Sequence, residues 1–195
     1  MKYQLTKSIS KSFEKSIQLI IDICESEIEK IFLLKIINNI LKRPDRYSLS
    51  FILVESETKI VNGIEVVSKV NFQMPDSFGY LCGVRINNFI SKTFVEIFPQ
   101  KIVEFENPDN ILHIMSYRLD FGIYKYNSID PKTIIKKYCI ECDGFEFHNT
   151  KEQIKKDNER VRNLLLQHSY TTLRYLGTEI HNWDENEVGR FIWNL

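Results

Sequence analysis

Three carboxylates lie on two apolar segments that have the composition of β-strands. Asp120 is flanked in the sequence by Leu119 and Phe121, whereas Glu141 and Asp143 occupy alternate positions of the second segment. In an extended chain alternate side chains share a face, so Glu141 and Asp143 should point in the same direction. A buried carboxylate is costly unless it is paired or binds a cation, and oxygen ligands suit Mg²⁺, which Mn²⁺ could replace. The pattern therefore predicts metal-assisted hydrolysis, with a phosphodiester as the expected substrate.

Each of these acids has a second interpretation that involves no catalysis. Asp120 could pair with Arg118 or Lys137, and Asp143 followed by Gly144 is a favoured tight turn. His148 ends an alternating apolar run. It could be a solvent-exposed histidine with no functional role, or it could accept a proton from water beside a metal.

A basic helix is predicted directly after His148, over residues 151–168. Lys151, Lys155 and Arg162 recur at four- and seven-residue steps and could form a stripe that binds phosphates, with Arg160 as a further nucleic-acid contact. Such contacts would position a nucleic acid without reading its sequence. The alternative is a solvated face with ion pairs between residues four positions apart.

The remaining elements frame these residues. The apolar spacing over residues 7–42 predicts helix, and the capping box Ser26-Glu27-Ile28-Glu29 divides it into two helices that meet near Cys24. Short strand-like runs follow over residues 44–110, as an extension of the core sheet or as an inserted lobe. Strands over 111–126, 136–143 and 171–176, and a closing helix over 182–195, complete an α/β fold with a mixed sheet flanked by helices.

The length of 195 residues predicts one domain, with a core of about 8–43 and 111–195 and a β-rich insertion of about 44–110. Lys and Arg together number 26, as do Asp and Glu, so a nucleic-acid partner would have to meet a local patch. No apolar run approaches membrane-spanning length and the first residues lack a signal-peptide core, which predicts a cytoplasmic protein without a membrane partner. Cys139 and Cys142 would face opposite sides of a strand, which favours reduced core thiols over a zinc site.

The ordered series of motifs resembles the very-short-patch-repair-like branch of the PD-(D/E)xK nucleases. The resemblance covers about residues 111–181. It is carried by Tyr117-Arg118-Leu119-Asp120-Phe121, Ile140-Glu141-Cys142-Asp143-Gly144-Phe145-Glu146-Phe147-His148, Lys151-Glu152-Gln153, Lys156-Asp157, Arg160, Arg162, Leu173-Arg174-Tyr175 and Gly177-Thr178-Glu179-Ile180.

The resemblance implies a restriction-endonuclease-like fold and a Mg²⁺-dependent endonuclease. Asp120 and Glu141 would hold the metal with help from the Cys142 carbonyl, and Glu29 would add an outer carboxylate. His148 would help to activate the attacking water. Asp143 stands where the superfamily has lysine, a departure that Lys151 could compensate.

DNA is the expected substrate, and the sequence leaves RNA open. Because the superfamily lysine is absent, the alternative is an inactive module that binds nucleic acid or a protein partner on the same fold. A homodimer or a helicase-type partner is compatible with the neutral net charge.

Overall fold

The computed structural model describes residues 11–55, 58–61, 64–67, 79–107, 110–144 and 150–195. The helices are α1 (Lys11–Asp22), α2 (Glu27–Leu41), α3 (Lys151–His168), α4 (Gly177–Asn182) and α5 (Glu185–Asn194). The strands are β1 (Tyr47–Glu55), β2 (Thr58–Val61), β3 (Ile64–Val67), β4 (Gly79–Asn88), β5 (Thr93–Asn107), β6 (Asn110–Asn127), β7 (Ile134–Asp143) and β8 (Tyr170–Leu176). The predicted α/β class is confirmed, and the short helix α4 is an addition to the predicted order.

The main sheet has the strand order β1-β4-β5-β6-β7-β8. Its neighbouring strands are antiparallel except β7 and β8, which run parallel and are connected through α3. A parallel pair needs such a crossover, because a tight turn can join only antiparallel strands. Strands β1, β4 and β5 therefore extend the same sheet as β6–β8, whereas β2 and β3 pair with each other separately.

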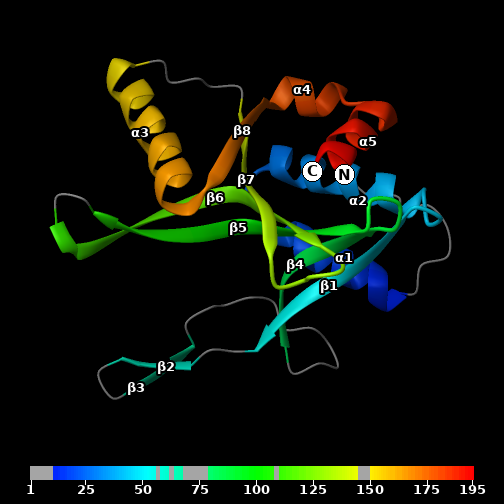
Figure 1. Ribbon diagram of the computed structural model, residues 1–195, viewed down its shortest axis with the longest axis horizontal. Coiled ribbons are helices and arrows are strands. Elements are labelled where there is room, and N and C mark those ends of the chain that lie inside the picture. Colours follow the sequence, from blue (N-terminus) through cyan, green and yellow to red (C-terminus); the bar gives the residue numbers. More distant parts are fainter. Residues whose placement is uncertain (1–10, 56–57, 62–63, 68–78, 108–109, 145–149) are drawn as a thin grey trace.

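Helices cover both faces of this sheet (Figure 1). On one face Phe32 of α2 and Phe191 of α5 belong to a large apolar cluster with Ile140 of β7. On the other face Leu164 of α3 packs in a smaller cluster with Cys139, the neighbour of Ile140. Adjacent residues of a strand point to opposite faces, so the crossover helix and the remaining helices lie on opposite sides of the β7–β8 pair.

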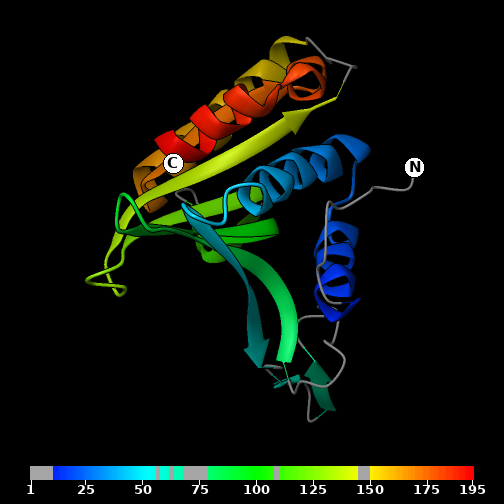
Figure 2. The same cartoon turned by 90° about the vertical axis from the view of Figure 1, so that its right-hand side faces the viewer.

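The predicted break between the first two helices is confirmed. Ser26 caps α2: its hydroxyl accepts a hydrogen bond from the Glu29 amide, and the Glu29 carboxylate accepts one from the Ser26 amide. Figure 2 shows α1 and α2 meeting at an angle, with α1 beside β4. Ile17 and Ile20 of α1 are buried in the large cluster, and each such side chain contributes about 1.5–3 kcal/mol to folding.

The cysteines agree with the expectation of core thiols. Cys24, Cys82, Cys139 and Cys142 form no disulfide bond within the described residues, and Cys139 and Cys142 belong to the two clusters on opposite faces. Within the described residues, no helix combines the length and the apolar character needed to cross a membrane.

Candidate acidic site where two strands separate

Asp120 lies at an interruption of the strand β6. Leu119 packs in the smaller cluster with Leu164, whereas Phe121, two residues later, packs in the large cluster with Phe32. A regular strand would place residues 119 and 121 on the same face. The Cα pairing of β5 with β6 also omits Gln100 and Asp120, and Gln100 has a left-handed backbone with φ 52°. Asp120 therefore occupies the position at which the strand exchanges faces.

The strands β6 and β7 stop pairing at the same place. Their last pair is Phe121 with Ile140, and beyond it the Cys142 amide donates a hydrogen bond of 2.7 Å to Asp120 Oδ2. The Asp120 side chain thus replaces the backbone acceptor that a continued ladder would have supplied. This bond holds the carboxyl group between the two separating strands.

The pKa of Asp120 is raised from its ordinary value of 3.8 to about 7. Burial is the main cause, and the negative charge of Glu141 is the next largest. Glu29 raises this pKa further, whereas the Cys142 amide and Arg160 lower it. The structure therefore brings the three predicted acids Asp120, Glu141 and Glu29 into one electrostatic neighbourhood.

Glu141 is stabilised by an arginine from the crossover helix. Its side chain is only 12% exposed, and Arg160 Nη2 lies 2.9 Å from its Oε1 atom. The Cys139 thiol donates to the same oxygen at 3.0 Å. Burial raises the pKa of Glu141, and Arg160 opposes that rise. Arg160, predicted as a phosphate contact, also donates to the Arg118 carbonyl and is thus engaged inside the protein.

Glu29 closes the predicted capping box, and its charge also acts on Asp120. Its carboxylate closes the capping box with Ser26, and it also accepts hydrogen bonds from the Glu25 amide at 3.0 Å and from Gln100 Nε2 at 2.6 Å. Its charge reaches Asp120, since it contributes to the raised pKa there. Because both Glu29 oxygens accept hydrogen bonds, we infer that Glu29 acts on the site through its charge.

Asp143 is held by a second arginine. Arg174 of β8 donates through Nε at 2.9 Å and through Nη2 at 2.8 Å to the two Asp143 oxygens, and its Nη1 atom pairs with Asp157 of α3 at 2.9 Å. Arg174 thus forms ion pairs with both Asp143 and Asp157. These partners raise the pKa of Arg174 above its ordinary value.

The remaining predicted residues belong to α3 and the segment before it. His148 lies outside the described residues, as do the other residues of 145–149. Lys151 is the first residue of α3, after the N-cap Thr150, and it is exposed. Lys155 and Arg162 are exposed on the same helix, which leaves their charges open to solvent.

Gln100 is a site residue that the sequence did not indicate. Its amide nitrogen is committed to Glu29, and its buried Oε1 atom has no hydrogen-bond partner among the described residues. Since Nε2 must be the donor to a carboxylate, Oε1 is available as a hard oxygen donor. The sequence around Gln100 contains no motif that would indicate a contact with Glu29 or an available oxygen donor.

The carboxylate oxygen atoms of this site are of the kind that hard divalent cations prefer. Asp120 Oδ1 and Glu141 Oε2 receive no hydrogen bond from the residues that the structure describes. Within the same residues, no group of three or more His, Cys, Asp and Glu side chains is arranged to hold a metal ion. Mg²⁺ commonly uses one or two carboxylates and completes its shell with water and substrate phosphate, so two carboxylates suffice for a substrate-assisted site.

Comparisons of the chain with models of protein families, with curated proteins and with solved structures found no match. Function is therefore inferred from the residues of the site.

Proposed function

We propose that this protein is a divalent-metal-dependent endonuclease that hydrolyses phosphodiester bonds, with DNA as its substrate. The observation that carries the proposal is the junction of β6 and β7, where Asp120 accepts a hydrogen bond of 2.7 Å from the amide that directly follows Glu141. The charge of Glu141 also raises the pKa of Asp120. Two partly buried carboxylates in this relation repel each other, and a divalent cation would relieve that repulsion. The mixed sheet with helices on both faces is compatible with the restriction-endonuclease-like fold that forms part of the proposal.

Each residue has a defined task in this proposal. Asp120 and Glu141 would hold Mg²⁺ or Mn²⁺, which when bound would polarise the phosphate and lower the pKa of a water molecule. Arg160 favours the ionised form of Glu141 and orients its carboxylate. His148 would accept the proton of the attacking water, and Lys151 would stabilise the charge that develops on the phosphate.

The exposed basic residues of α3 would position the substrate. Lys151, Lys155 and Arg162 present charges to solvent on the helix that also supplies Arg160 to Glu141. A nucleic-acid backbone along this helix would lie next to the acidic site. Phosphate contacts of this kind give binding that weakens steeply with salt and carries little sequence preference.

A plasmid-nicking assay with Mg²⁺ or Mn²⁺ tests the proposal. Asp120→Asn and Glu141→Gln each remove one charge with little change of shape, and we expect each to reduce nicking by at least about 100-fold. Glu159→Gln, an exposed substitution on α3, is the matched control and should cleave like the wild type. Equal nicking by the wild type and by Asp120→Asn would overturn the assignment of this site.

The second candidate function is binding without cleavage, to nucleic acid or to a protein partner. The two arginine pairs favour it, because Arg160 and Arg174 already compensate Glu141 and Asp143 without a metal. Fluorescence anisotropy with labelled DNA at increasing salt would show salt-sensitive binding, while the nicking assay would show no product with either metal. Co-purification of a helicase-type partner, or a dimer in light scattering, would identify the assembly in which such a cytoplasmic module acts.

A further inference from the structure

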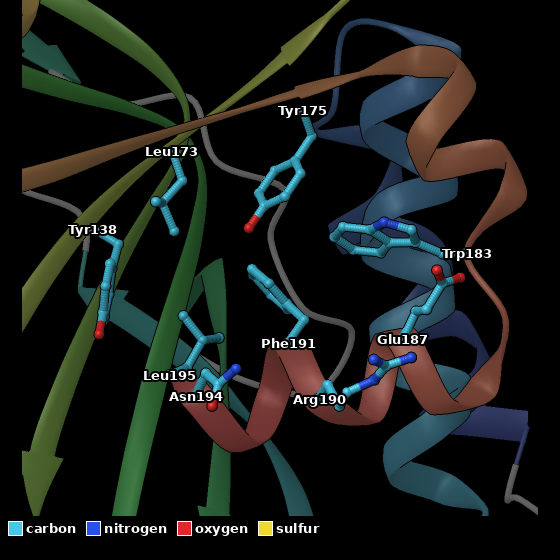
Figure 3. Close-up of a pocket in the computed structure, with 9 residues that line it drawn as sticks. All are labelled: Tyr138, Leu173, Tyr175, Trp183, Glu187, Arg190, Phe191, Asn194 and Leu195. Carbon is cyan, nitrogen blue, oxygen red and sulfur yellow. The ribbon is translucent and has the colours of Figure 1, made fainter.

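A second site lies against the sheet face that carries α2 and α5. An open cavity of about 420 Å³ is lined by residues of β7, β8 and α5 and by Trp183, which precedes α5 (Figure 3). Cavities of about 300–1,000 Å³ are typical of sites for small organic ligands. In Figure 3 the Tyr175 ring points its hydroxyl into the space between Leu173 and Phe191.

The walls of this cavity are aromatic. Trp183 and Phe191 have ring centroids 5.4 Å apart at an interplanar angle of 36°, and Tyr175 is nearly perpendicular to both, at 78° and 84°. Tyr138 of β7 forms a further wall. These rings contact one another, and each of them also lines the cavity, where a planar ring could contact them.

Polar groups without partners line the same cavity. Neither tyrosine hydroxyl, nor the Arg190 guanidinium, nor the Asn194 amide makes a hydrogen bond or ion pair with any residue that the structure describes. Arg190 and Asn194 lie four residues apart on α5, so they share one face of the helix. Arg190 and Asn194 are exposed, so their polar groups lie at the open side of the cavity and are accessible to a ligand.

One carboxylate also lines the cavity, and its charge is partly balanced. Glu187 accepts a hydrogen bond from the Asp184 amide at 2.9 Å, which closes the capping box of α5. Its charge also raises the pKa of Lys35, against the larger lowering that burial causes. Arg190 is thus the cation of this cavity that is available for an anionic ligand.

We propose that this cavity binds a nucleotide. The base would stack on Trp183 and Phe191, Asn194 and the tyrosine hydroxyls would bond to polar atoms of the base or sugar, and Arg190 would pair with the phosphate. A free mononucleotide and an unstacked nucleotide of a single strand present the same chemistry to these groups. The experiment below includes a separate ligand for each source.

This nucleotide site is separate from the acidic site. Glu141 pairs with Arg174 in the β7–β8 ladder, and the next pair, Cys142 with Tyr175, points to the opposite face. Glu141 and Asp143 therefore lie on the face of the β7–β8 pair opposite to the cavity. Nucleotide binding here needs no metal and does not depend on the proposed nuclease activity.

Tryptophan fluorescence in EDTA tests the nucleotide site directly. The chain has two tryptophans, and Trp193 is 53% exposed outside the cavity lining, so the variant Trp193→Phe leaves Trp183 as the reporter. We expect saturable quenching by deoxyadenosine monophosphate and about tenfold weaker binding of deoxyadenosine. Inorganic phosphate should cause no quenching. A short oligodeoxyadenylate distinguishes the two sources, because quenching by the oligonucleotide alone identifies a nucleotide within a strand.

Arg190→Gln is the decisive variant, because Arg190 is exposed and its replacement leaves the core intact. It should weaken binding of the nucleotide about tenfold and leave binding of the nucleoside and the thermal midpoint unchanged. Arg46→Gln, an exposed arginine outside the cavity, is the matched control and should bind like the parent protein. No saturable quenching by either nucleotide probe, or equal affinity in Arg190→Gln and its parent, would overturn the proposal.

Discussion

The backbone amide of Cys142 lies 2.7 Å from Asp120 Oδ2, at the point where β6 and β7 no longer pair. The Asp120 carboxylate accepts a hydrogen bond from the backbone of β7. At the same position the side chains of β6 change from one face of the sheet to the other. The carboxyl group is thereby held in a partly buried position beside Glu141. The strand interruption and the acidic site are thus one feature of the fold.

The raised pKa of Asp120 predicts a pH-dependent stability that one substitution should remove. A folded-state pKa of about 7 against an ordinary 3.8 means that the folded chain binds this proton more tightly, so stability is lost as pH rises through about 4 to 7. At about 1.4 kcal/mol per pH unit, discounted for partial exposure, Asp120→Asn should gain about 2 kcal/mol over the wild type between pH 4 and pH 8.

Urea unfolding in EDTA at both pH values measures this difference. Asp45→Asn, an exposed acid beside Arg46, serves as the control and should follow the wild type. A parallel pH dependence of the wild type and Asp120→Asn would show that Asp120 is not the titrating group.

The ion pair of Arg160 with Glu141 predicts a strong coupling between these residues. Arg160→Gln removes the main charge that compensates Glu141 beside Asp120, and we expect a loss of about 2–4 kcal/mol in the free energy of unfolding at pH 8. Glu141→Gln in the same chain should recover much of that loss, because the uncompensated carboxylate is then absent. A double-mutant cycle by urea unfolding checks this, and additive effects of the two substitutions would contradict the pairing.

Local patterns were sufficient to predict several of these features. The capping box at Ser26 correctly divided the N-terminal helices, and the bounds 151–168 of α3 follow from its spacing and agree with the structure. The opposite faces of Cys139 and Cys142 likewise follow from strand geometry alone. Each of these features depends on residues that are close in the sequence.

The site could be predicted only in part, because its geometry depends on contacts between distant residues. Strand alternation alone places Asp120 on a regular strand and gives no indication of the face exchange between Leu119 and Phe121. The partners Gln100 for Glu29 and Arg160 for Glu141 are separated from them by 71 and 19 positions. The residue pattern within one helix or strand cannot predict contacts between residues of different elements.

Gln100 offers a test of the cation site that is independent of activity. Gln100→Glu places an additional carboxylate against Glu29, so without metal we expect a loss of about 1–3 kcal/mol in the free energy of unfolding. Mn²⁺ should then stabilise this variant more than it stabilises the wild type, because a bound cation offsets the added charge. Thermal unfolding with Mn²⁺ and with EDTA measures both effects, with Gln100→Leu as the uncharged comparison. Equal stabilisation of all three proteins by Mn²⁺ would place the cation elsewhere.

The central claim is that Asp120 and Glu141 hold one divalent cation between them. An anomalous difference map from crystals soaked in Mn²⁺ tests it most directly. We predict a peak within coordination distance of Asp120 Oδ1 and Glu141 Oε2, which is lost in crystals of Asp120→Asn. The absence of any peak in the wild type, with Cys142 still bonded to Asp120 and Arg160 still bonded to Glu141, would contradict the account.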